Sequence, residues 1–297
     1  MRNTMEKCEF TPEQLREVQL KGLEILKYFK QFCEENHLLF YFCGGCCIGT
    51  LRHGGFIPWD DDVDVFMPRE DYERLGKLWN EKADTSRYSY CRTDETTYTR
   101  ILPTTIRDNN TTFIRTRQCD LDINHGLMID ILPLDGCPSG KFKRKMQIMW
   151  ALLFSMFNTQ EAPTSKGKLF TLIGRILLAL VPTQKGRYRV WRFCEKKMSQ
   201  YKIEDCDYIT ELCARYRYMT NEYPKAIFAE AVYKDFEGYQ MPIPVGYDTY
   251  LKMAFGDYMQ LPPEEERIAK HDVVMCDLHN SYLKYKGQYY CVDGENL

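Results

Sequence analysis

Four aspartates in five consecutive positions, Asp60, Asp61, Asp62 and Asp64, form the most chemically suggestive segment of this 297-residue sequence. Asp62 and Asp64 are two residues apart, and on an extended strand such side chains project from the same face. Carboxylates held this close repel each other unless a divalent cation lies between them, and purely oxygen ligands suit Mg²⁺ or Mn²⁺. We therefore predict a metal site at Asp62 and Asp64, with Asp60 as a third ligand if the strand begins early enough.

A single aspartate farther along the chain is predicted to join this site. Asp130 is isolated in the apolar run 127–132, and an unpaired carboxylate buried there would cost several kcal/mol. The metal held by Asp62 and Asp64 is its simplest partner. Asp130 would complete the metal shell or accept a proton from a substrate hydroxyl, and the sequence leaves both roles open. The alternative for the acidic segment, a turn that caps the next helix, is disfavoured because its carboxylates adjoin apolar residues.

Residues suited to binding phosphate precede the acidic segment. Gly44 and Gly45 follow a predicted strand and precede a predicted helix, so that their backbone can approach a phosphate and offer N–H donors. Arg52 can grip a phosphate with two hydrogen bonds, and His53 can support it. The structural alternative for Arg52 is a cation at the end of its helix. Four further arginines lie between the second and third predicted strands, and we expect one or two of them to reach substrate phosphate: Arg100, Arg107, Arg115 and Arg117.

The surrounding pattern predicts the elements that position these residues. Thr11, Pro12 and Gln14 are typical of a helix start, and an apolar stripe continues from Leu15 to Cys33. Buried strands are predicted at 37–43, 56–67 and 127–132, the last one closed by Pro133, with helices at 46–53 and 68–83. This alternation indicates an α+β fold, in which a mixed sheet is flanked by helices.

The stretch 141–202 differs from the rest of the chain. It contains 14 Lys or Arg and only two acidic residues, Glu161 and Glu195, so its net charge is about +12. The rest of the chain therefore carries a net charge of about −14. Its two apolar runs, 146–157 and 169–181, are shorter than the ~20 residues that cross a bilayer. One interpretation is a helical insertion that packs on the main body. The other is a peripheral contact with an anionic membrane surface, and both can hold at once.

Composition excludes other classes. The chain has 40 Lys+Arg and 42 Asp+Glu, and this balance argues against binding to nucleic acid. Its 13 cysteines are scattered, and its N-terminus lacks the apolar core of a signal peptide. We therefore expect free thiols and a location in the cytoplasm. Any membrane attachment would be peripheral, at the inner face of the membrane. Cys43 and Cys46 have a zinc-like spacing, but no second pair follows, and Cys43, Cys46 and Cys47 are predicted to be core thiols.

Together these motifs resemble the signature of the LicD family, which includes bacterial phosphocholine transferases and is related to the fukutin group. The resemblance extends over about residues 11–280, and the stretch 57–64 is its most specific part. The matching segments are Gly44-Gly45, 49–53, 55–64, 69–72, 126–135, 244–248, 255–259, 261–263 and His271.

The resemblance implies a nucleotidyltransferase-like fold and Mg²⁺-dependent transfer of a phospho-alcohol, typically phosphocholine from CDP-choline, to a cell-surface glycan or glycolipid of the teichoic acid or lipopolysaccharide type. It implies catalytic roles for Asp62, Asp64 and Asp130. The implied substrate-binding residues are Gly44, Gly45, Thr50, Arg52, His53, Trp59 and His271. We expect a catalytic core at 1–140, a basic helical insertion at 141–202, and a return to the core at 203–297. Two alternatives stay open: a nucleotidyltransferase that moves a nucleotide onto a small molecule, and a non-catalytic membrane scaffold.

Overall fold

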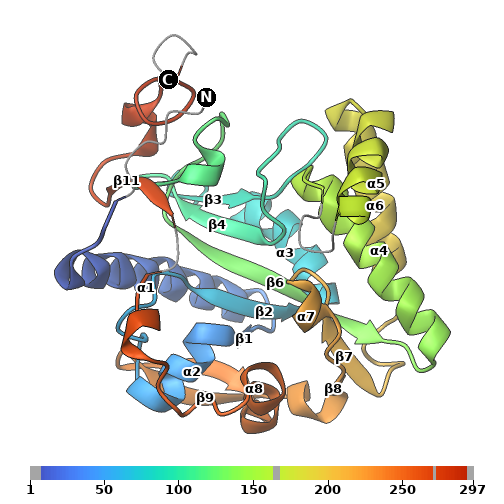
Figure 1. Cartoon of the computed structure of the whole chain (residues 1–297). Helices are drawn as coiled ribbons and strands as arrows, with labels where there is room; N and C mark the ends of the chain where they lie inside the picture. Colours follow the sequence, from blue (N-terminus) through green and yellow to red (C-terminus); the bar gives the residue numbers. More distant parts are fainter. Residues whose placement is uncertain (1–7, 163–167, 270–271, 293–297) are drawn as a thin grey trace. The chain divides into compact units, whose positions relative to one another are not determined.

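A computed structural model describes residues 8–162, 168–269 and 272–292 (Figure 1). The chain divides into two compact units. Unit 1 contains the residues up to Cys91, the segment 105–131 and the residues from 227 onward. Unit 2 contains the segments 92–104 and 132–226. The helices 141–202 thus belong to a larger unit, and the domain limits predicted at 140 and 202 stay a prediction.

Unit 1 is built on strands flanked by helices, which confirms the predicted α+β class. The strand order is β1-β2-β6-β4-β3, the hairpin β9–β10 and the pair β5–β11 are separate, and every pairing with a defined register in this unit is antiparallel. Its longer elements are α1 (Pro12–Glu35), β1 (Tyr41–Phe42), α2 (Gly44–His53), β2 (Asp64–Pro68), α3 (Arg69–Lys82), β3 (Tyr88–Cys91), β4 (Thr104–Asp108), β5 (Thr112–Arg115), β6 (Met128–Cys137), β9 (Ala231–Phe236), β10 (Tyr239–Pro244), α8 (Tyr247–Phe255) and β11 (Val273–Asp277). Its short 3₁₀ turns are Thr116–Gln118, Lys225–Phe228, Glu264–Glu266 and Tyr282–Tyr285, the second of which begins in unit 2.

Helix α1 begins where the sequence predicts. The Thr11 side chain accepts a hydrogen bond from the Gln14 N–H at 3.3 Å, and the Gln14 side chain accepts one from the Thr11 N–H at 3.0 Å. This reciprocal pair satisfies donors that the first helical turn leaves open. The predicted apolar stripe, including Leu26 and Phe29, is fully buried, so the helix is held by its packed face.

The second predicted strand is shorter than expected, and this corrects the predicted geometry of the acidic segment. Strand β2 begins only at Asp64, so Asp60 and Asp62 lie in the preceding loop. The Gln19 amide of α1 donates to the carbonyl oxygens of Ile57 at 3.1 Å and Asp60 at 2.9 Å. Because these acceptors are bound by a helix side chain, they are unavailable to a neighbouring strand, and the loop turns instead. The first predicted strand, at 37–43, is also shorter than expected, because only Tyr41 and Phe42 form β1.

The third predicted strand is longer than expected. The prediction ends this strand at Leu132, before Pro133, but β6 continues to Cys137. Its second half lies in unit 2, where Leu134 to Cys137 pair with β7, antiparallel, from Glu211 to Tyr208. Pairing with a strand 71 to 77 residues away cannot be seen in a local sequence pattern, and it outweighs the strand-breaking tendency of proline and glycine.

Unit 2 is mainly helical, as predicted for 141–202. Its elements are the end of β6, α4 (Lys141–Thr159), α5 (Lys168–Leu180), α6 (Gln184–Met198), β7 (Tyr208–Glu211), α7 (Tyr216–Met219) and β8 (Tyr223–Pro224). Helices α4 and α6 contribute Phe154, Phe157 and Trp191 to one buried cluster, which Leu178 of α5 joins. Among the described residues, no helix is both long and apolar enough to span a membrane.

A buried acid in unit 2 gives a testable pH dependence. Glu211 accepts a hydrogen bond from the Tyr223 hydroxyl at 2.5 Å, and burial raises the pKa of its carboxyl to about 7. The unfolded chain loses this proton near the ordinary value of 4.5. Stability is therefore lost as the pH rises through this window, by on the order of 3 kcal/mol. We expect Glu211→Gln to remove this loss, as measured by urea unfolding at pH 4.5, 6 and 8. Parallel pH profiles for the variant and the wild type would contradict the assignment.

Candidate active site

Three aspartates form a compact acidic cluster in the loop before β2. Asp60, Asp61 and Asp62 each place one carboxylate oxygen within 4.8 Å of the others. Asp61 was not among the predicted ligands, because alternation along a strand would have turned it to the opposite face. In a loop that alternation does not hold, and Asp61 joins its neighbours with only 6% of its surface exposed.

Asp64 and Asp130 extend this cluster from two adjacent strands. The Asp130 N–H donates to the Val63 carbonyl at 2.8 Å, which ties β6 to the residue before Asp64. Burial raises the pKa of Asp64 well above its ordinary value, and the charges of Asp62, Asp130 and Asp60 raise it further. The Oδ1 atom of Asp130 is buried and accepts no hydrogen bond from any residue that the structure describes.

These residues fit a divalent cation. The donor set consists only of carboxylate oxygens, the ligands that Mg²⁺ and Mn²⁺ prefer. A cation would offset the mutual repulsion that raises the pKa of Asp64. It would also give the buried oxygen of Asp130 a partner.

The glycine pair at the start of α2 lies directly against the carboxylates. A Cβ atom on Gly45 would lie 2.1 Å from Oδ2 of Asp60, and one on Gly44 would lie 4.0 Å from Oδ2 of Asp64. Gly44 has a φ of +47°, in the region that favours glycine. Its N–H donates to the Tyr250 hydroxyl at 3.1 Å. The two glycines form the first turn of the helix and not a separate turn before it, and their approach to a phosphate stays a prediction.

A polar network that the sequence analysis missed holds the loop before the acidic cluster. Gln19 is 4% exposed and binds the Ile57 and Asp60 carbonyls described above. The Arg16 guanidinium donates to Gln19 and, at 2.8 and 2.5 Å, to both carboxylate oxygens of Glu237. Gln19 occurs on the apolar face of α1, and a polar residue in that stripe was the available signal.

Arg52, His53 and Trp59 gather at the other end of α2. The Arg52 guanidinium donates to the Tyr258 carbonyl at 2.9 Å and to the His53 ring at 2.9 Å. The guanidinium carbons of Arg52 and Arg267 lie 6.0 and 5.6 Å from the Trp59 ring. Burial and the charge of Arg267 lower the pKa of Arg52, while burial and Arg52 lower that of His53. Two cations around one indole favour an anionic group over a choline ammonium.

The remaining predicted residues lie elsewhere or outside the described chain. The Thr50 hydroxyl donates to the Cys46 carbonyl inside α2 at 2.7 Å and is buried, so its role in substrate binding stays a prediction. His271 lies outside the described residues. Cys43, Cys46 and Cys47 are buried free thiols, as predicted, and burial raises the pKa of Cys47 to about 12.

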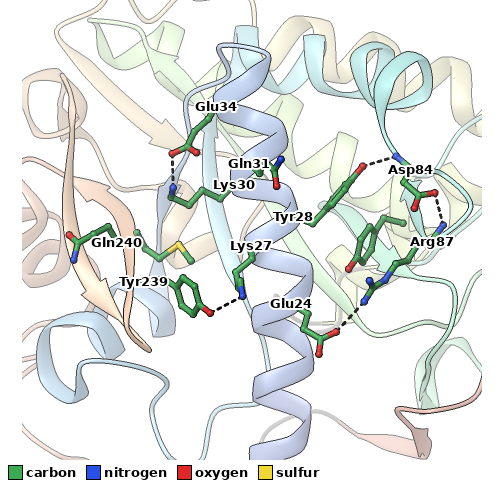
Figure 2. Close-up of a pocket in the computed structure, with 12 residues that line it drawn as sticks. Glu24, Lys27, Tyr28, Lys30, Gln31, Glu34, Asp84, Arg87, Tyr239 and Gln240 are labelled. Atoms are coloured by element: carbon green, nitrogen blue, oxygen red, sulfur yellow. Dashed lines mark hydrogen bonds and ion pairs between the residues drawn. The ribbon is translucent and has the colours of Figure 1, made fainter.

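A hollow of about 580 Å³ along α1 is not the candidate site (Figure 2). On one side of the helix Lys27 donates to the Tyr239 hydroxyl at 2.8 Å, and on the other Glu24 pairs with Arg87 at 3.1 Å. Its lining contains none of the aspartates discussed above. Because these charged groups already satisfy one another, the hollow offers little for a charged substrate.

The fold and the acidic site define the class as an α+β protein with a carboxylate site suited to a divalent metal. Residues 37–167 match the family described as LicD/FKTN/FKRP, nucleotidyltransferase domain. The chain is 31% identical over 268 residues to the lipopolysaccharide cholinephosphotransferase LicD of Haemophilus influenzae, a match that covers 86% of this chain and 96% of that protein. The chain belongs to the LicD family, which confirms the resemblance seen in its motifs. An uncharacterized protein of Rickettsia prowazekii, RP689, is 26% identical over 72 residues, covering 22% of this chain and 27% of that protein.

Proposed function

We propose that the chain transfers phosphocholine, or a closely similar phospho-alcohol, from a CDP-activated donor to a lipopolysaccharide, a teichoic acid or a lipid-linked glycan precursor. The observation that carries this proposal is the 31% identity to the Haemophilus transferase over 96% of its length. The acidic cluster and the adjoining glycine helix start supply the chemistry that such a transfer needs.

The carboxylates are the proposed holders of the divalent cation. Asp60, Asp61 and Asp62 would hold it from the loop, with Asp64 and Asp130 from the neighbouring strands. Bound there, the metal would neutralise charge on the donor phosphates. The start of α2, kept free of side chains by Gly44 and Gly45, can lie against the same phosphates.

The proposed transfer replaces a phosphoanhydride bond of the donor with a phosphoester bond to the acceptor. The acceptor hydroxyl oxygen forms a bond to the phosphorus of phosphocholine, the bond from this phosphorus to CMP breaks, and the hydroxyl proton leaves. Asp130 is the candidate to accept that proton, because its buried oxygen has no hydrogen-bond donor among the described residues. As a metal ligand it would instead fix the position of the donor.

Mass spectrometry of the reaction products tests the proposal. The protein is incubated with Mg²⁺, CDP-choline and purified lipopolysaccharide, and we expect CMP and an acceptor heavier by one phosphocholine. An acceptor heavier by a nucleotide, formed from a nucleoside triphosphate, would favour the nucleotidyltransferase alternative. If neither donor is consumed while membrane binding persists, the scaffold alternative is favoured. CDP-ribitol and CDP-glycerol in parallel reactions would rank the transferred alcohol.

We propose further that α5 rests on an anionic membrane surface at the cytoplasmic face, where a lipid-linked acceptor is within reach. Gly174 and Leu178 of this helix are buried, and its opposite face exposes five aliphatic side chains at helical spacing. Each is between 45% and 71% exposed: Leu169, Leu172, Ile173, Ile176 and Leu180. The net charge of about +12 over 141–202 complements acidic lipid headgroups.

Vesicle flotation checks this surface. We expect Leu172→Gln/Ile176→Gln to reduce binding to vesicles of phosphatidylglycerol and phosphatidylcholine by at least about tenfold, because each aliphatic side chain contributes 1.5–3 kcal/mol when buried. A matched control is Leu261→Gln/Leu283→Gln, since these side chains are 45% and 66% exposed on unit 1. Equal binding by the two double variants would count against α5 as the membrane contact.

A further inference from the structure

The Arg115 guanidinium has no hydrogen-bond or ion-pair partner among the residues that the structure describes. Arg115 ends β5 and is half-buried. Its Nε is buried without a hydrogen-bond acceptor, and its other donors form no hydrogen bond or ion pair with the described residues. The Phe113 N–H of β5 donates to the His125 carbonyl at 2.7 Å, so β5 lies beside the segment that leads into β6 and Asp130. The charge of Arg115 acts on Arg107 and on Asp64, which agrees with this placement. A guanidinium carries five donors, and no residue that the structure describes accepts a hydrogen bond from those of Arg115.

A second guanidinium lies behind it. Arg107 of β4 is 0% exposed. Its Nε donates to the Thr105 hydroxyl at 3.0 Å and a second nitrogen donates to the Asn124 carbonyl, while Nη2 is buried without an acceptor. It forms no ion pair with any carboxylate in the described part of the chain. Burial lowers the pKa of Arg107, and the charge of Arg115 lowers it further, while Asp130 acts in the opposite direction. A buried cation with so little compensation is costly.

Opposite charges are therefore carried on neighbouring strands here, and these four side chains form no ion pairs with one another in the described part of the chain. Strands β2, β6 and β4 are neighbours in the sheet and carry Asp64, Asp130 and Arg107, while Arg115 comes from β5. Among the residues described, none donates to Oδ1 of Asp130, and none accepts from Nη2 of Arg107 or Nε of Arg115. A phosphate bound to a divalent metal fits this arrangement. The metal would bind the carboxylate oxygens, and the phosphate would accept hydrogen bonds from the guanidinium groups.

We infer that Arg115 binds the donor phosphate that coordinates the metal, and that the buried Arg107 is a positioning residue that keeps this place positively charged. The identity of that phosphate as part of a CDP-activated donor rests on the proposed function. The phosphate site itself rests only on the arrangement of these four side chains. The structure thus selects two of the four arginines that the sequence left undecided.

Calorimetric titration of inorganic pyrophosphate with Mg²⁺ tests the site without requiring turnover. We expect Arg115→Gln to weaken pyrophosphate binding by at least about tenfold, because charge-assisted hydrogen bonds are lost. The matched control is Arg189→Gln, which removes the same charge from an exposed side chain in unit 2 and should change the affinity less than about twofold. Thermal unfolding of both variants verifies that they are folded.

Different results would overturn the phosphate site and the proposed function. Wild-type affinity in Arg115→Gln, or no pyrophosphate binding by the wild-type protein with Mg²⁺, would overturn the phosphate site. Loss of binding in Arg115→Gln, combined with no transfer from CDP-choline by the wild-type protein, would keep the phosphate site and overturn only the proposed function.

Two substitutions of Arg107 test its positioning role separately. Because it is inferred to act through its charge, Arg107→Lys should retain most of the pyrophosphate affinity, whereas Arg107→Met should lose about as much as Arg115→Gln does. A purely structural role predicts instead that both variants lower the unfolding temperature and leave the affinity of the folded fraction unchanged.

Discussion

Replacing Asp64 with asparagine should abolish transfer and stabilise the metal-free fold at the same time. The substitution removes a carboxylate proposed to hold the cation, and a metal contributes several kcal/mol to such a transition state, so we expect at least about a hundredfold lower kcat. Burial and neighbouring carboxylates raise the pKa of Asp64, so its contribution to stability is lost as the pH rises through that pKa. Asp64→Asn should therefore gain about 0.5–2 kcal/mol in metal-free buffer at pH 8.

Two measurements on each protein check this pair of effects. Product mass spectrometry gives the rate, and thermal unfolding with EDTA or with Mg²⁺ gives the stability. Mg²⁺ should raise the unfolding temperature of the wild-type protein and leave that of Asp64→Asn nearly unchanged. The matched control is Asp205→Asn, because Asp205 is an exposed carboxylate in unit 2. A variant that loses stability and activity together would indicate that Asp64 is mainly structural.

A single methyl group at Gly45 should be nearly as damaging. The Cβ atom of alanine there would lie 2.1 Å from Oδ2 of Asp60, so this carboxylate must move while the helix can stay in place. A displacement of about 1 Å at a reacting site can cost about a hundredfold in rate. Alanine is a better helix former than glycine, by up to about 1 kcal/mol, so the loss of activity should occur without a loss of stability. Steady-state kinetics and urea unfolding measure the two effects.

The opposite end of the same helix provides the control. Gly54 is the C-cap residue of α2 and has a φ of +66°. A Cβ atom on Gly54 would have no heavy atom of the described residues within 4 Å beyond its chain neighbours. Gly54→Ala should therefore lose about 1–2 kcal/mol from backbone strain and keep its transfer rate. If Gly45→Ala transfers at the wild-type rate, the contact between α2 and Asp60 has no part in catalysis.

The sequence alone determined those helices and strands whose signals lie within their own segment of the chain. The capping residues and stripe of α1 satisfy their own backbone and mark their own buried face, so this helix was predicted to within two residues of its end. The α+β class and the helices of 141–202 were predicted for the same reason. The run of aspartates indicated an oxygen-ligand metal site, because carboxylates so close in sequence must lie close in space.

Only the tertiary structure decided which residues distant in the chain meet at that site. Gln19 of α1 binds the backbone of the acidic loop, which turns Asp61 toward its neighbours and delays β2 to Asp64. The order β2-β6-β4 places Asp130 on the strand next to that of Asp64 and Arg107 on the strand after it, although these residues are 66 and 43 positions farther along the chain. Such meetings depend on strand pairing and on the desolvation of charged groups, and neither quantity is encoded in the spacing of residues along a single segment.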